Sequence, residues 1–275
     1  MKKILIVGLG LIGGSMAKAL KRNTSHRILG LDIREETLLD ACSLGVIDAK
    51  ATPEDIADAD ILYLCTYLDE AVSFIEKYGT MLKPGCIVTD TCGVKTAICS
   101  QIEKIDGAFH FVGAHPMAGK EKHGFSASDP SIFIGSSYII TPERAPAHAV
   151  NTVADLAKSM GFGRIVYTTP AEHDKMIAFT SQIPHVIACA YVLSPACEFH
   201  EGFSAGSYRD VSRVADINAP LWNRLFLENK QALVSELDIF LQNVQSIRDS
   251  IEREDGEQLM QLLETAASVK RRDPV

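Results

Sequence analysis

Residues Lys3–Gly13, with the sequence KILIVGLGLIG, decide the fold of the first part of the chain. The aliphatic run at its start predicts a buried strand, and the three glycines that follow have the spacing GxGxxG. The amphipathic segment Ile12–Lys21 predicts a helix that begins inside the glycine motif, and a second apolar run, Ile28–Leu31, ends next to Asp32. This order of strand, glycine turn, helix and acid-ended strand predicts a dinucleotide-binding βαβ unit.

The glycine motif and Asp32 also predict which cofactor the chain binds. The first glycine permits a tight turn, the second lets the backbone approach a diphosphate, and the third lets helix and strand pack closely. We expect the cofactor to lie against six consecutive residues, Gly8, Leu9, Gly10, Leu11, Ile12 and Gly13. The Asp32 carboxylate suits the ribose hydroxyls and repels a 2′-phosphate, which favours NAD over NADP, whereas Arg34 suits either adenine stacking or a 2′-phosphate.

Apolar runs and amphipathic segments alternate up to about residue 168. Strands are predicted at Lys3–Val7, Ile28–Leu31, Ile61–Cys65, Ile87–Thr89, Phe109–Gly113, Tyr138–Ile140 and Ile165–Tyr167. Helical patterns lie between them, for example at Glu35–Leu44 and His148–Ser159. We therefore expect an α/β fold, with a Rossmann-type, mostly parallel sheet in an N-terminal dinucleotide-binding domain of residues 1–168.

The pattern becomes helical after Pro170, which predicts an all-α second domain of residues 169–275. Pro184 interrupts the helical run Ala171–Leu193 and predicts a kink. Apolar residues recur every three or four positions along Leu225–Arg248, which predicts one long amphipathic helix. Because so long an apolar stripe needs a partner, we expect a substrate and dimerisation domain, and a homodimer.

The composition excludes several classes of protein. The chain has 275 residues, of which 47% are hydrophobic and 23% charged, and no run approaches the ~20 apolar residues that cross a membrane. Its net charge of −8 does not provide the positive charge that binding of nucleic acid requires, so a nucleic-acid-binding protein is not expected. The early glycines interrupt any secretion signal, so we expect a cytoplasmic protein. Its seven cysteines include no CxxC pair, and we expect buried thiols without disulfides or a metal site.

His115 is the first candidate for a catalytic residue. It follows the predicted strand Phe109–Gly113, and the carboxyl ends of parallel strands face the ligand crevice in this type of fold. An imidazole titrates near neutral pH, which suits a group that takes a proton from an alcohol while a hydride leaves its carbon. Taken alone, a histidine before proline in a loop is more often structural than catalytic.

Several motifs in the chain resemble those of one enzyme family. Gly113–Gly119, with the sequence GAHPMAG, and the nearby Glu121 resemble the GxHPMxG signature of prephenate and arogenate dehydrogenases, which act in tyrosine biosynthesis. Four further segments match the family, and all the motifs occur in the family's order: Thr89-Asp90 with Val94-Lys95 before this signature, and Ser181–His185, Tyr208–Ala215, and Trp222 with Leu227–Lys230 after it. The resemblance covers the chain from Lys3 to about Lys230 and implies a Rossmann-type domain followed by a helical dimerisation domain.

The resemblance also implies roles for individual residues. His115 would accept the proton of the substrate's ring hydroxyl as hydride passes to the nicotinamide, and loss of the ring carboxylate as carbon dioxide would leave an aromatic ring. The guanidinium of Arg213 would bind a substrate carboxylate through two parallel hydrogen bonds. His185 would also face the substrate, Arg209 would supply a second basic group, and Glu121 would pair with an arginine as a gate.

Gly93 departs from the family pattern. The family has a serine at this position, and its hydroxyl supports the histidine and the substrate. We expect Thr89, Thr91, Cys92 or a water molecule to take over this function, and we expect Gly93→Ser to be tolerated or mildly activating. Lys95 would cap its helix or neutralise a nearby charge.

Two alternatives to this enzyme class remain open at this point. A β-hydroxyacid dehydrogenase shares the architecture and would use a lysine of the helical domain, for which Lys175 is available, but it would not explain the GAHPMAG motif or Arg213. An NAD-binding redox sensor would bind the cofactor without turnover. The sequence also does not distinguish prephenate, which carries a keto group on its side chain, from arogenate, which carries an amino group.

Overall fold

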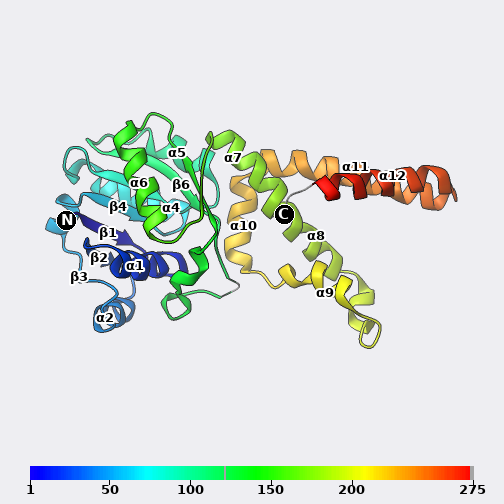
Figure 1. Ribbon diagram of the computed structural model, residues 1–275, viewed down its shortest axis with the longest axis horizontal. Coiled ribbons are helices and arrows are strands. Elements are labelled where there is room, and N and C mark those ends of the chain that lie inside the picture. The colour runs from blue at the N-terminus through cyan, green and yellow to red at the C-terminus, as the bar shows by residue number, and fades with distance from the viewer. Residues whose placement is uncertain (121, 273–275) are drawn as a thin grey trace.

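The computed structural model describes residues 1–120 and 122–272, which form an α/β part followed by a helical part (Figure 1). The strands are β1 (Lys3–Val7), β2 (Arg27–Leu31), β3 (Ala49–Lys50), β4 (Ile61–Leu64), β5 (Ile87–Asp90), β6 (His110–Pro116), β7 (Ser137–Thr141) and β8 (Arg164–Tyr167). The helices of this part are α1 (Leu11–Asn23), α2 (Glu35–Ser43), α3 (Pro53–Ala57), α4 (Leu68–Tyr78), α5 (Lys95–Ile102) and α6 (Ala147–Ser159).

The helical part begins directly after the last strand. It contains α7 (Pro170–Ile177), α8 (Ile183–Val192), α9 (Gly206–Ser212), α10 (Ala219–Glu228), α11 (Lys230–Glu252) and α12 (Gly256–Arg272). Shorter turns are the 3₁₀ segments Gly79–Met81, Phe125–Ala127, Pro130–Phe133, Pro195–Phe199 and Arg213–Ala215, and the π-helical segment Ala178–Gln182. None of the helices in the described residues is both long and apolar enough to cross a bilayer.

The eight strands form one sheet in the order β3-β2-β1-β4-β5-β6-β7-β8. All neighbours are parallel except β6 and β7, which confirms the predicted mostly parallel sheet of Rossmann type. Every predicted strand is present, and only the two-residue edge strand β3 lacks a hydrophobic pattern long enough to predict it.

Two hydrophobic cores cover the two faces of the sheet. Ile4 and Ile6 of β1 point to the face covered by α1, α2 and α6, while Leu5 and Val7 point to the face covered by α3, α4 and α5. Successive strand residues point to opposite faces, so a strand buried on both sides is apolar at every position. This requirement explains the unbroken aliphatic run at the start of the chain.

The structure corrects the predicted position of His115. The strand does not end at Gly113 but continues to Pro116, because Gly113–Pro116 pair with the antiparallel strand β7. His115 therefore lies within the end of a strand, opposite Ile139, and not in a loop. Its backbone is fixed by the sheet.

The predicted single helix Leu225–Arg248 is wrong in one respect. Asn229 separates α10 from α11, with φ −105° and ψ 25°. Its buried side chain donates to the Asp174 carbonyl and to Gln182 Oε1, at 2.9 and 2.8 Å, and these contacts hold the junction. The predicted interruption at Pro184 takes the form of the π-helical segment that immediately precedes α8, because a proline has no N–H for the helix.

Candidate active site

The glycine loop lies between β1 and α1, where the predicted cofactor site requires it. Gly8 has a φ of +87°, and a Cβ built there would lie 2.6 Å from the carbonyl oxygen of Cys65. A Cβ built on Gly13 would lie 1.9 Å from the Gly8 carbonyl oxygen. Both positions thus require glycine. Helix α1 has no capping side chain and no acidic residue in its first turn, so its N–H groups suit an anionic ligand.

Asp32 lies directly beside this loop. Its Oδ2 accepts the Leu9 N–H at 2.8 Å, and its Oδ1 accepts the Arg34 N–H at 2.9 Å. These hydrogen bonds place a carboxylate at the end of β2 and next to the glycine loop, and each oxygen keeps a lone pair for a hydroxyl donor. The Arg34 guanidinium is more exposed and lies 3.9 Å from Asp32 Oδ1. The residues present therefore fit the diphosphate and ribose of a dinucleotide.

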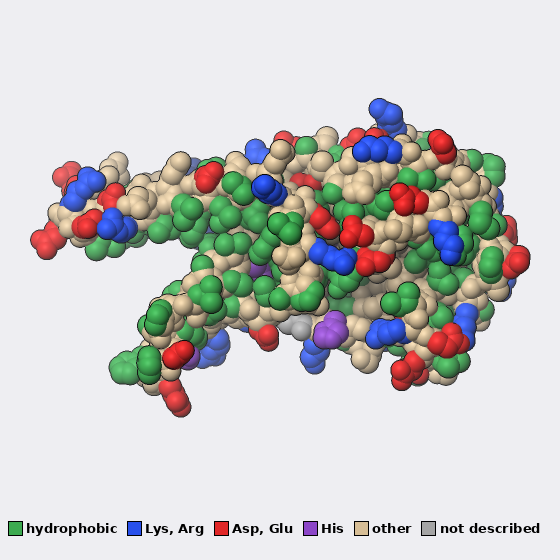
Figure 2. Space-filling view, turned by 180° about the vertical axis from the view of Figure 1, so that it is seen from behind, with side chains coloured by type: hydrophobic (Ala, Val, Ile, Leu, Met, Phe, Trp, Pro, Cys, Tyr) green, Lys and Arg blue, Asp and Glu red, His purple; other side chains and the backbone are tan. Residues whose placement is uncertain are grey.

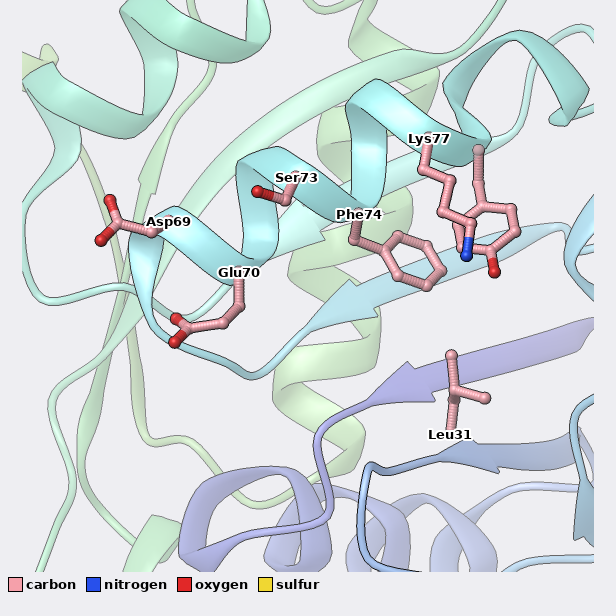
Figure 3. Close-up of a pocket in the computed structure, with 7 residues that line it drawn as sticks. Leu31, Asp69, Glu70, Ser73, Phe74 and Lys77 are labelled. Atoms are coloured by element: carbon pink, nitrogen blue, oxygen red, sulfur yellow. The ribbon is translucent and has the colours of Figure 1, made fainter.

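A hollow of about 430 Å³ lies between the end of β2 and α4, one residue from Asp32 (Figure 3). It is lined by Leu31, Asp69, Glu70, Ser73, Phe74, Lys77 and Tyr78. Figure 3 shows the Phe74 ring on α4 pointing toward Leu31 at the end of β2. The lining combines the apolar side chains of Leu31, Phe74 and Tyr78 with polar and charged side chains of α4.

His115 is held by a pair of residues that the sequence reasoning missed. Its Nδ1 lies 2.9 Å from Nε2 of His173, and Nδ1 of His173 lies 2.7 Å from Oδ1 of Asp174. Both partners are buried on α7, in the helical part of the chain. Their spacing to the apolar Ile177 and Ala178 places them on the same buried face of the helix, which is the signal that could have found them.

Burial affects the protonation of this cluster. It lowers the pKa of His115 well below its ordinary value, and the nearby His173 and Lys95 act in the same direction. The pKa of His173 is also lowered by burial, against the opposing effect of Asp174. Both imidazoles are therefore neutral at pH 7, as a proton acceptor requires.

Lys95 does more than the helix capping or charge neutralisation expected of it. Its side chain is fully buried in an ion pair with Asp90, and its Nζ donates to the Ala114 carbonyl at 2.7 Å. Asp90 Oδ1 in turn accepts the Ala114 N–H at 2.9 Å. The pair thus clamps both backbone groups of the residue that precedes His115. Removing one partner of a buried pair typically costs about 3–5 kcal/mol, because it leaves an uncompensated charge.

His185 lies on α8 and stacks on Trp222 of α10, with ring centroids 3.7 Å apart. Its Nδ1 donates to the Ser181 carbonyl at 2.7 Å, so in the neutral ring Nε2 is left as an acceptor. Arg209 lies on α9 and Arg213 in the turn that follows, and both segments pack against α8. The structure thus places the three predicted substrate residues on one substructure, while Glu121 lies outside the described residues. Lys175 is exposed on α7.

The space expected for a serine at position 93 is partly occupied. Gly93 has no positive φ, but a Cβ built on it would lie 2.9 Å from Cδ2 of Leu225 on α10. No special backbone conformation demands this glycine; a leucine from the helical part fills the volume instead. Nδ1 of His115 contacts His173 and none of the substitutes proposed from sequence: Thr91 Oγ1 and Cys92 Sγ contact the carbonyl oxygens of Leu64 and Thr66, and Thr89 is fully buried.

We therefore predict that Gly93→Ser folds but loses about 1–3 kcal/mol of stability through overpacking against Leu225. In a protein that already carries Leu225→Ala, Gly93→Ser should cost less stability than it does in the wild type, because the clashing side chain is gone. Chemical denaturation of the four proteins measures the coupling. Additive effects in this cycle would contradict the contact.

Comparisons with known proteins agree with this arrangement. The family model described as "Prephenate dehydrogenase, nucleotide-binding domain" matches residues 16–167, and "Prephenate dehydrogenase, dimerization domain" matches residues 169–265. Prephenate dehydrogenase of Bacillus subtilis is 31% identical over 96% of this chain and 74% of its own length. Cyclohexadienyl dehydrogenase of Zymomonas mobilis is 32% identical over 94% of this chain and 92% of its own length.

Solved structures give the same result. Prephenate dehydrogenase of A. aeolicus, in complex with hydroxyphenyl propionate and NAD+, is 29% identical with a TM-score of 0.88 and covers 98% of this chain and 97% of its own. Synechocystis arogenate dehydrogenase is 26% identical with a TM-score of 0.86, covering 98% and 99%. A 3-hydroxyisobutyrate dehydrogenase at 18% identity and a TM-score of 0.53 shares the fold alone, so the β-hydroxyacid alternative is not favoured. The chain belongs to the prephenate dehydrogenase family.

Proposed function

We propose that this protein catalyses the NAD-dependent oxidative decarboxylation of prephenate to 4-hydroxyphenylpyruvate, or of arogenate to tyrosine. The observation that carries the proposal is the placement of His115. It lies at the carboxyl end of β6, on the same edge of the sheet as the glycine loop after β1, and its ring is held by His173. The family match and the relatives that act on these substrates support it.

The proposed reaction requires His115 to act as a proton acceptor. NAD held by the glycine loop and Asp32 would supply the acceptor for the hydride that leaves the ring carbon bearing the hydroxyl. Nε2 of His115 takes the hydroxyl proton as that carbon becomes a carbonyl, the bond to the ring carboxylate breaks, and its electron pair enters the ring. The oxygen then recovers the proton to give a phenol. His115 holds the proton and returns it to the same oxygen, so this step needs no second acid or base. The other contribution of the protein is to orient the substrate against the cofactor.

Substrate binding falls to the helical part in this proposal. Arg213 binds a carboxylate, since its planar fork suits two parallel hydrogen bonds, and Arg209 adds a second cationic group. His185 offers Nε2 beside the Trp222 ring, and Glu121 acts as the gate. We also propose the division into a cofactor domain of residues 1–168 and a substrate and dimerisation domain of residues 169–275. The hollow beside Asp32 would receive the adenosine end of the cofactor.

Asp32 provides a test of cofactor choice. We predict that Asp32→Ala weakens NAD binding more than NADP binding, so that the ratio of the two affinities falls about tenfold, which corresponds to about 1.4 kcal/mol. Loss of the Leu9 contact affects both cofactors alike, so the ratio isolates the ribose. Asp32→Asn, which keeps an acceptor but no charge, is the control. Calorimetric titrations that show an equal loss for both cofactors would remove Asp32 from the ribose site.

A homodimer is the assembly we propose. The helical part has two arms, one formed by α8, α9 and the segment between them, and the other by α11 and α12 (Figure 1). Large apolar side chains are exposed on both arms, including Phe199, Phe203, Leu241, Val244, Met260 and Leu263. Figure 2 shows hydrophobic side chains along the inner sides of these arms. Contiguous exposed apolar side chains mark interaction surfaces, and symmetric pairing is the commonest way to cover them.

We predict a particle of twice the 29.9 kDa chain mass in light scattering. Leu241→Glu with Val244→Glu should shift it toward a single chain, because two carboxylates would be buried in the interface. The matched control is Glu257→Gln at an exposed site on α12. A single-chain mass for the wild type would contradict the proposal.

Turnover tests the proposed function. Prephenate and arogenate are each supplied with NAD and with NADP, and formation of reduced cofactor is followed. We expect turnover with NAD and at least one of the two substrates. Turnover of 3-hydroxyisobutyrate in their place would instead support a β-hydroxyacid dehydrogenase, and NAD binding without any turnover would support a sensor.

A further inference from the structure

We infer that His173 and Asp174 are positioning residues that hold His115 in one tautomer, with the proton on Nδ1 and with Nε2 as the acceptor. The use of that acceptor in turnover rests on the proposed function, but the tautomer itself does not. The inference follows from three hydrogen-bonding steps that begin at a carboxylate and end at the catalytic ring.

The first step is the state of Asp174. Its Oδ1 accepts the Lys95 N–H at 2.7 Å, and its Oδ2 accepts the Thr96 N–H at 2.8 Å, at the start of α5. Burial raises its pKa, but the hydrogen bonds from His173 and from these two amides outweigh burial and hold the pKa below the ordinary value. The carboxylate is therefore ionised and only accepts hydrogen bonds.

The second step fixes His173. Because Asp174 only accepts, the proton between them must be on Nδ1 of His173, 2.7 Å away. A neutral imidazole carries one proton, so Nε2 of His173 has a lone pair. The opposite arrangement would require protons on both nitrogens, and burial disfavours that charged ring.

The third step fixes His115. Its Nδ1 lies 2.9 Å from the lone pair on Nε2 of His173, so Nδ1 of His115 must be the donor. The neutral ring then leaves Nε2 unprotonated. An acid that selects the tautomer of a catalytic histidine is the arrangement of serine hydrolases, where loss of the correct tautomer reduces kcat about 10⁴-fold. Here a second histidine lies between the acid and the base.

The support of the base comes from the other part of the chain. His115 belongs to the sheet, while His173 and Asp174 belong to α7. The Asp174 carbonyl accepts from Asn229 at the junction of α10 and α11, and Asn229 also donates to Gln182, just before α8. The tautomer of His115 thus depends on how α7 packs against α5. The position of the helical part therefore determines whether Nε2 of His115 can accept a proton.

Nuclear magnetic resonance tests the tautomer without any turnover. Long-range ¹H–¹⁵N correlation spectra of the labelled wild-type protein at pH 7 distinguish protonated from unprotonated ring nitrogens, and His115→Asn identifies the His115 signals. We expect Nδ1–H and bare Nε2 for both His115 and His173. A His115 ring protonated on Nε2 would overturn the inference. Because no substrate is present, failure of the proposed function would not change this result.

Two substitutions at His173 test its role in turnover. The longer amide side chain of His173→Gln would place an oxygen near the position of Nε2, whereas His173→Asn reaches only the position of Nδ1 and Asp174. We expect His173→Asn to lower kcat by about 10–100-fold with substrate KM and NAD affinity nearly unchanged, and His173→Gln to recover most of that loss. Lys175→Met, exposed on the same helix, is the control and should behave as wild type.

A merely structural role gives a different pattern. Equal losses in the His173→Asn and His173→Gln variants, or losses carried by KM, would overturn the positioning role even if both proteins fold. Thermal unfolding of each variant shows whether folding is intact. If neither variant folds, the wild-type spectrum still decides the tautomer.

Discussion

His115→Asn is expected to lower kcat by about 10²–10⁴-fold and to leave NAD binding unchanged, because one proton acceptor contributes a factor of that size. The substitution is selective for a structural reason. The asparagine amide reaches the position of Nδ1 and can still donate to His173 Nε2, but no atom remains at the position of Nε2. Packing and support are kept, and only the acceptor is lost.

Steady-state kinetics and calorimetric NAD titration measure these two effects separately. His148→Asn serves as the control, since this exposed histidine lies on α6 and its ring packs against His110, away from His115. Full turnover by His115→Asn with intact NAD binding would remove His115 from the role of base. A loss confined to NAD binding would place it at the cofactor instead.

The second large effect is expected at the glycine loop. Gly13→Ala would place a Cβ 1.9 Å from the Gly8 carbonyl oxygen and 2.9 Å from Cys65 Cβ. The first of these neighbours is backbone, so the loop or α1 must move. We expect NAD affinity to fall by at least about 100-fold, roughly 2.7 kcal/mol, together with a clear loss of stability, because helix and strand can no longer pack closely.

Gly10→Ala is the matched comparison for this prediction. A Cβ at Gly10 meets nothing within 4 Å, and the residue has a φ of −73°, which any residue adopts. Its free energy of unfolding should stay within about 0.5 kcal/mol of wild type, while NAD affinity falls because the methyl group stands where the diphosphate approaches. Wild-type NAD affinity in Gly10→Ala would show that the cofactor does not contact this loop.

Local sequence patterns were sufficient to predict the sheet. The central strands β1, β4 and β5 are buried on both faces, and such strands produce continuous aliphatic runs that stand out beside amphipathic helices. The glycine motif adds steric requirements that the structure repeats at Gly8 and Gly13. The end of β6 was misplaced by three residues, because pairing with β7 extends it through His115 and is a long-range interaction.

The missed parts of the site depend on contacts between distant segments. His173 and Asp174 are separated from His115 by 58 residues or more, and only folding brings their helix to the end of β6. Likewise, Gly93 departs from the family pattern for a reason visible only in space, since Leu225 fills the neighbouring volume. The break at Asn229 interrupts an apolar periodicity that is otherwise continuous, and buried hydrogen bonds determine it.

The stoichiometry of a single reaction tests the central claim most directly. Purified protein is incubated with NAD and limiting prephenate, and in parallel with limiting arogenate, and NADH, carbon dioxide and the aromatic product are quantified in the same samples. The account predicts equal amounts of the three products from at least one substrate, all abolished or strongly reduced by His115→Asn. Formation of NADH without carbon dioxide, or no NADH from either substrate, would contradict it.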